Sequence, residues 1–123
     1  MYEQTVIVGR LGGDPEMRFV PNGDAVTNFS VAVNARWIGA DGEPHDRTTW
    51  YKVVCWGKLA ESTNRYLTKG RMVMVTARRI QAEAYLDREG KPKAALKLTA
   101  DAVKFLDSPA NDRDAEDDAG MPF

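Results

Sequence analysis

Three side chains in one strand-like segment, Trp50, Lys52 and Trp56, have the types and spacing to bind single-stranded nucleic acid. Residues two apart share a face of a strand, so these three lie opposite Tyr51 and Val53. Bases of any sequence can stack on an indole ring, and the lysine adds positive charge for the phosphates. Because a lysine between them is costly to bury, we expect both tryptophans to be exposed rather than part of the core.

Trp37 follows a different pattern. It falls on the same parity as Phe29, Val31 and Val33, which are expected to face the core. The pattern alone therefore favours a buried Trp37, unless a bulge or a twist of the strand re-aims its ring.

Basic residues are spread around these aromatic residues. Each alone is typical of a solvated surface charge, whereas together they predict a positive track for phosphates whose binding weakens steeply with salt. The residues are Arg36, Arg47, Lys52, Lys58, Lys69, Arg71, Arg78 and Arg79.

The charge is divided unevenly along the chain. Residues 1–106 hold sixteen Lys and Arg against twelve Asp and Glu, while residues 107–123 hold one Arg against six acids. A basic body suggests a polyanionic ligand, and an acidic end is either a solubilising segment or an interaction arm.

The sequence offers no grouping typical of an enzyme. Cys55 and His45 are the only cysteine and histidine, so neither a cysteine-based metal cluster nor a His-assisted nucleophile is expected. Cys55 reads as a small buried apolar residue, and His45 as a loop residue. The glycines of residues 9–14 lack the Lys-Ser/Thr ending of a phosphate-binding loop, which favours a turn. We expect no catalytic activity, no metal and no cofactor.

The dominant hydrophobic period is two, which predicts an all-β domain of five or so strands. The expected strands cover residues 2–11, 25–38, 48–56, 72–81 and a last segment that ends near Leu106, with one short helix over residues 59–67. Strands this few would leave long unpaired edges in an open sheet, so a closed five-stranded barrel of the OB-fold type fits best. A small sandwich remains an alternative. No apolar run is long enough to span a membrane and no signal peptide is evident, so a soluble, cytoplasmic protein is expected.

Several blocks resemble the bacterial single-stranded DNA-binding protein family. In order and spacing they cover about residues 4–80, and their sequences are VIVGRLGGDPEMR (6–18), PNG (21–23), VTNFSVA (26–32), TWYKVV (49–54), WGKLAE (56–61) and YLTKG (66–70). The resemblance implies an OB-fold, usually a homotetramer, that coats single-stranded DNA without sequence preference in DNA replication, recombination and repair. It also implies a nucleoid-associated location.

Residue by residue, the resemblance assigns base stacking to Trp37, Trp50 and Trp56, which overrides the core interpretation of Trp37. Tyr85 is the candidate for a fourth stacking ring in the long hairpin. Tyr51 lies beside a stacking tryptophan, and Lys52, Lys58 and Lys69 match basic positions near the DNA path.

The chain is expected to divide into an OB-fold domain, residues 1–106, and a short disordered linker with an acidic tip, residues 107–123. The resemblance implies that the tip docks on replication and repair proteins. Its expected contact residues are Asp117, Asp118, Met121, Pro122 and Phe123.

Two other functions remain possible from the residues alone. One is an OB-fold assembly module of a replisome that binds nucleic acid only weakly, and the other is a cold-shock-like RNA binder. The aromatic and lysine face argues against the first, and the lack of a phenylalanine-rich RNA-binding run argues against the second.

Overall fold

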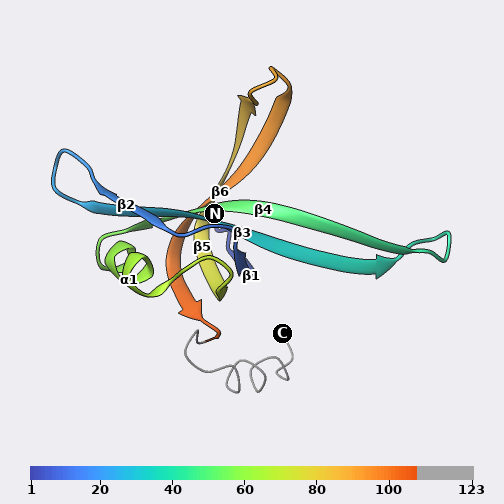
Figure 1. Cartoon of the computed structure of the whole chain (residues 1–123), viewed down its shortest axis with the longest axis horizontal. Helices are drawn as coiled ribbons and strands as arrows, with labels where there is room; N and C mark the ends of the chain where they lie inside the picture. The colour runs from blue at the N-terminus through green and yellow to red at the C-terminus, as the bar shows by residue number, and fades with distance from the viewer. Residues whose placement is uncertain (108–123) are drawn as a thin grey trace.

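The computed structural model describes residues 1–107, which form six strands and one helix (Figure 1). The strands are β1 (Thr5–Leu11), β2 (Glu16–Phe19), β3 (Ala25–Ile38), β4 (Pro44–Trp56), β5 (Met72–Leu86) and β6 (Pro92–Phe105). The helix α1 (Lys58–Tyr66) lies between β4 and β5 in the chain.

Five of these strands close into a barrel. The order β1-β5-β6-β4-β3 is closed by a further pairing of β1 with β3, and β2 pairs with β3 outside this ring. All pairs are antiparallel except β4 with β6, which is parallel. The prediction of a five-stranded OB-fold barrel with one short helix is confirmed, and the sandwich alternative is wrong.

Closure depends on a close crossing of β1 and β3 at Gly9. A Cβ atom at this position would lie 2.2 Å from the carbonyl oxygen of Ala32 and 2.8 Å from Cγ1 of Val31. Only a glycine lets the two backbones approach this closely. Inside the barrel, side chains from every barrel strand pack together, among them the fully buried Val31, Val53, Val73, Val75 and Leu98.

Helix α1 packs against one end of the barrel. Its residues Ala60 and Thr63 are buried, and the Thr27 hydroxyl of β3 donates a hydrogen bond of 2.6 Å to the Ala60 carbonyl. Leu67, which follows the helix, is also buried in the core. The helix and the residue after it therefore cover part of the barrel core.

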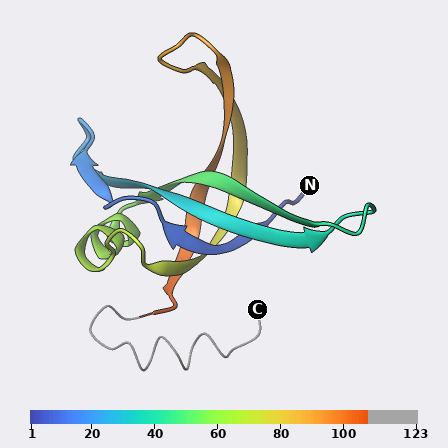
Figure 2. The same cartoon turned by 45° about the vertical axis from the view of Figure 1, so that its right-hand side comes forward.

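Two long hairpins project from the barrel in different directions (Figures 1 and 2). We call them the β3–β4 arm, with its tip near residues 39–43, and the β5–β6 arm, with its tip near residues 87–91. Along both arms most side chains are exposed on both faces, because neither face covers the core.

The expected strand boundaries differ at β1, which begins at Thr5 rather than at residue 2, and along the two arms. β4 begins at Pro44 rather than at residue 48, and β5 continues to Leu86 rather than ending at residue 81. A ribbon exposed on both faces lacks the alternation of apolar and polar residues that marks a half-buried strand. The four-residue β2 was not expected at all, because it is too short to show a period. No helix in residues 1–107 is long and apolar enough to cross a membrane.

Candidate nucleic-acid interface

All four aromatic residues expected to stack on bases lie at the surface. The exposed fractions are 44% for Trp37, 53% for Trp50, 47% for Trp56 and 52% for Tyr85. Single exposed aromatic residues are common on protein surfaces, so the surroundings of each ring decide whether it can bind a base.

Trp50 and Tyr85 line the same surface hollow, which has a volume of about 480 Å³ and also contains Lys52. Trp50 is on β4 and Tyr85 is on β5, 35 positions later in the sequence. Both strands pair with β6: Tyr51, next to Trp50, pairs with Leu96, and Tyr85 pairs with Lys93. The hollow thus joins two aromatic rings and a cation, a combination typical of single-strand binding, and the acidic residues Asp14 and Glu16 also line it. The expected exposure of Trp50, Lys52 and Trp56 is confirmed, and Val53 is buried as expected. The alternation is broken at Val54, which shares their parity but is buried between Val53 and Cys55.

Trp56 lies at the end of β4 and lines two further hollows of about 700 and 560 Å³. Arg79 of β5 lines both of them. An irregularity in the pairing of β5 with β6 shifts the register between Ala77 and Arg79. Such a bulge re-aims the following side chains, and Arg79 lines the same two hollows as Trp56.

Trp37 lies near the tip of the β3–β4 arm, where it pairs in register with His45. The indole and imidazole rings are stacked, with centroids 5.5 Å apart and planes inclined by 19°. The guanidinium carbon of Arg47 lies 5.6 Å from the centroid of the indole ring. Trp37 also lines a hollow of about 460 Å³. The pattern-based expectation of a buried Trp37 is wrong, because the arm has left the barrel at this point and there is no core for the inner face to meet.

His45 was expected to be an ordinary loop residue, and its contact with Trp37 was missed. Its Nε2 lies 3.2 Å from Oδ1 of Asp41. The pKa of Asp41 is lowered by the hydrogen bond from the Glu43 backbone and by the contact with His45. The contact of His45 with Trp37 could have been predicted from the register of the β3–β4 hairpin, because the length of the turn decides which residues of the two strands lie opposite each other.

The expected basic residues fall into two groups. Arg36 pairs with Asp46 at 3.4 Å, Arg78 pairs with Asp101 at 3.6 Å, and Arg47 lies over Trp37. The others at the surface form no ion pair with residues of the described part: Lys52, Lys58, Lys69 and Arg79. Arg47 also forms no ion pair within residues 1–107, so Arg47 and this second group keep a positive charge free to meet phosphates.

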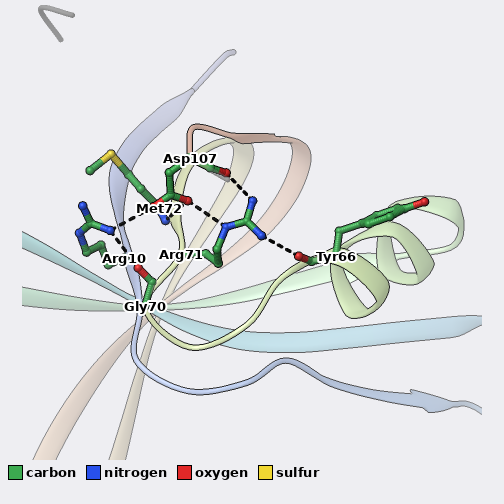
Figure 3. Close-up of polar contacts among 6 residues, drawn as sticks. All are labelled: Arg10, Tyr66, Gly70, Arg71, Met72 and Asp107. Carbon is green, nitrogen blue, oxygen red and sulfur yellow. Dashed lines mark hydrogen bonds and ion pairs between the residues drawn. The ribbon is translucent and has the colours of Figure 1, made fainter. Parts of the chain in front are cut away.

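Arg71 does not belong to either group, because its side chain is used inside the fold (Figure 3). It is 8% exposed. Its Nε donates to Oδ1 of Asp107 at 2.9 Å, and its guanidinium also donates to the carbonyl oxygens of Tyr66 and Asp107. A guanidinium satisfied in this way cannot follow a DNA backbone, so the expected phosphate contact at Arg71 does not fit its position.

Asp107 is the centre of this cluster. It also accepts a hydrogen bond from the Met72 backbone at 3.0 Å, and Nη1 of Arg10 lies 3.2 Å from Oδ2. Burial raises the pKa of this carboxyl group, but the hydrogen bonds from Arg71 and Met72 and the nearby positive charges outweigh burial and hold it below its usual value. The cluster ties the end of β6 to the start of β5. The expected tip residues, Asp117, Asp118, Met121, Pro122 and Phe123, lie outside the described residues.

The chain is similar to proteins that are named for binding single-stranded DNA. A family model described as "Single-strand binding protein family" matches residues 2–106. Two proteins named single-stranded DNA-binding protein, from Neisseria meningitidis serogroups A and B, are each 40% identical over 103 residues, which cover 84% of this chain and 59% of theirs. Single-stranded DNA-binding protein 2 of Clostridium acetobutylicum is 35% identical over 120 residues, which cover 97% of this chain and 87% of that relative.

The fold is also similar to solved structures of single-stranded DNA-binding proteins. The Plasmodium falciparum SSB in complex with single-stranded DNA matches with a TM-score of 0.74 and 25% identity, over 87% of this chain and 97% of the other. The small single-stranded DNA-binding protein of Streptomyces coelicolor matches with a TM-score of 0.71 and 25% identity, over 85% and 94% of the two chains.

Proposed function

The chain belongs to the single-strand binding protein family, and from this premise we propose that it binds single-stranded DNA without sequence preference and protects it during replication, recombination and repair. The observation that carries the proposal is the set of hollows described above. Each expected stacking ring lines a hollow, and Trp50 and Trp56 each share theirs with a cation that has no acidic partner among residues 1–107, Lys52 and Arg79 respectively.

Separated rings suit a flexible single strand better than a duplex. Bases in a duplex are stacked on one another and offer no free faces, whereas an unpaired base can stack on an aromatic side chain. The rings lie on β4 and on both arms, so bases several positions apart in one strand could be held together. No side chain in the hollows needs to read a base edge, and binding through ring faces tolerates any sequence.

The direct test is a titration of intrinsic tryptophan fluorescence with poly-dT, repeated over a salt series and with duplex DNA. We expect strong quenching by poly-dT, weaker binding as salt increases and little response to the duplex. Absence of quenching, or an equal response to the duplex, would reject the proposal and favour an OB-fold assembly module with weak nucleic-acid binding.

Alanine variants separate stacking from folding. Replacing both Trp50 and Trp56 should weaken poly-dT affinity by more than about 1.4 kcal/mol, or about tenfold, with an unchanged circular dichroism spectrum. Phe19→Ala is the matched control, since Phe19 is 64% exposed but lies on β2, away from these hollows. If both tryptophans can be removed without loss of affinity, the stacking face is rejected.

We propose that the chain assembles as a homotetramer, and the free edge of β1 supports self-association. Within residues 1–107, Thr5–Arg10 pair with β5 along one edge of β1, whereas only Arg10 and Leu11 pair with β3 along the other. Backbone groups on the open edge of residues 5–9 can accept a strand from a second copy. Val6 on this strand is 54% exposed. Sedimentation equilibrium of the full chain tests the proposal: a mass equal to four chains is expected, and a mass equal to one or two chains would reject it.

For the whole protein we propose an OB-fold DNA-binding domain over residues 1–106 and a partner-binding segment over residues 107–123. The support is the acidic composition of residues 107–123 and the family resemblance of the tip. The chain spans 59% of the length of the Neisseria relatives. We also propose a non-catalytic role in the cytoplasm, at the nucleoid. Deleting the last six residues should abolish binding to replication and repair proteins and leave DNA affinity equal or higher.

A further inference from the structure

The larger hollow beside Trp56 contains a second aromatic ring that the sequence comparison did not single out. Tyr2 precedes β1 and is 74% exposed, and it lines the hollow of about 700 Å³ together with Trp56. The ring contacts found in residues 1–107 join Trp37 to His45 and Tyr66 to Phe105. The rings of Tyr2 and Trp56 therefore border one hollow without packing against each other.

Of the two arginines that line this hollow, Arg78 has an acidic partner and Arg79 has none among residues 1–107. Asp101 accepts a hydrogen bond from the Arg78 backbone at 2.7 Å and pairs with the Arg78 side chain at 3.6 Å. Arg78 and Asp101 are the two residues left out of register where the ladder of β5 and β6 is irregular. Arg79, the next residue, forms no ion pair with any described residue. One guanidinium is thus neutralised and the other is left for an anion.

We propose that this hollow is a subsite for one nucleotide of the bound single strand, in which the base contacts both Trp56 and Tyr2 and its phosphate meets Arg79. Tyr2 is then a further base-contacting residue. The inference rests on the proposed single-strand binding and deepens it, because it assigns a fifth aromatic contact and pairs it with a particular cation. Two rings at one base also place the nucleotide more firmly than one exposed ring can.

Cross-linking tests the contact directly. A dT oligonucleotide that carries 5-iodouracil should form a photo-cross-link to the full chain, and peptide mass spectrometry should locate part of the adduct at Tyr2. Cross-links confined to Trp37, Trp50 and Tyr85 would overturn the subsite.

Affinity measurements give an independent test. Tyr2→Ala should weaken poly-dT binding by at least about fivefold, while Tyr2→Phe retains the affinity. Phe19→Ala, the exposed aromatic control on β2, should have no effect. Tyr2 lies outside every strand and is exposed, so its replacement leaves the fold intact. Equal affinity of Tyr2→Ala and the unaltered chain would overturn the role of Tyr2.

The cation is tested by the salt dependence. Arg79→Gln should reduce the slope of log affinity against log salt by about one, whereas Arg18→Gln, an exposed arginine on β2, should not change it. If the Tyr2 and Arg79 variants bind normally while the Trp50 and Trp56 variants do not, the subsite fails and single-strand binding stands. If the unaltered chain does not bind poly-dT, both fail.

Discussion

The indole of Trp50 lies directly against the backbone of Gly12. A Cβ atom at position 12 would be 2.5 Å from Cζ3 and 2.8 Å from Cη2 of Trp50. Both distances are well below van der Waals contact, so the ring keeps this position only because residue 12 has no side chain. Gly12 follows β1, and Trp50 belongs to β4, so the turn after one strand sets the orientation of a ring on another.

Gly12→Ala should therefore displace the Trp50 indole and weaken poly-dT affinity by about 1 kcal/mol or more, the scale of one stacked base. Stability should change little, because the exposed indole can swing aside. Fluorescence titration and urea unfolding measure the two effects. Gly13→Ala is the matched control, since a Cβ there has no atom within 4 Å. Equal affinities of the two variants would mean that the position of the indole does not matter for binding.

His45→Ala should uncover the indole of Trp37. The imidazole is stacked on this ring in the structure, so its removal exposes a ring face to solvent. In a background with Trp50→Phe and Trp56→Phe, acrylamide should quench the remaining tryptophan more strongly after the change. His45→Phe keeps an aromatic cover and should restore the lower quenching. Identical quenching in all three proteins would contradict the stacked pair.

Asp107→Asn should lower the free energy of unfolding by about 1–3 kcal/mol at pH 7, because it leaves the buried Arg71 guanidinium without its charged partner. Asp46→Asn is the control, since the pair of Asp46 with Arg36 is highly exposed and should contribute about 1 kcal/mol or less. Urea unfolding of both variants measures the difference. Equal losses would argue against a structural role for the Asp107 cluster.

The lowered pKa of Asp107 should make the stability of the fold depend on pH. The pKa of Asp107 lies lower in the folded chain than its usual value of 3.8. Between these two pKa values the unfolded chain binds more protons, so stability rises with pH in this range. The contribution of Asp107 is complete above about pH 4 to 5 and is lost as the pH falls through the folded value. Unfolding experiments from pH 6 to pH 2 should show this loss in the unaltered chain and a smaller loss in Asp107→Asn.

Cys55 should resist thiol reagents while the chain is folded. It is fully buried, and burial raises the pKa of its thiol to about 12 although a contact with Thr63 opposes the shift. At pH 8 the thiolate is therefore scarce as well as inaccessible. Ellman's reagent should react slowly with the native chain and rapidly in urea, and fast stoichiometric reaction without urea would contradict the buried position.

The sequence predicted those parts of the fold in which one strand face meets the core. β3 runs from Ala25 to Ile38 as expected, and within it Thr27, Phe29 and Val31 are buried while Asn28 and Ser30 are more exposed. The alternation on β4 also placed Trp50 and Trp56 at the surface. The same reasoning failed for Trp37, since parity identifies a face of a strand but does not reveal whether the strand still lies on the barrel.

Other contacts join residues that are far apart in the sequence, and a local pattern of apolar and polar residues cannot predict them. The Arg71 side chain reads as one more surface cation in sequence, yet Asp107, 36 positions later, holds it inside the fold. The grouping of Trp50 with Tyr85 likewise depends on the pairing of β4 and β5 with β6, and Tyr2 reaches the hollow of Trp56 from the segment before β1. Arg10, another cation without an obvious role in the sequence, also belongs to the Asp107 cluster.

The two arms also bear on how such a chain can change length over evolution. Each arm is a two-stranded ribbon beyond the barrel, so residues can be gained or lost at its tip without disturbing the packed interior. Side chains alternate along a strand, so inserting two residues in each strand keeps every ring on its original face, whereas inserting one turns the distal rings to the opposite face. The spacing between Trp37 and the barrel is therefore adjustable only in even steps, and the path of the bound strand would lengthen in the same increments.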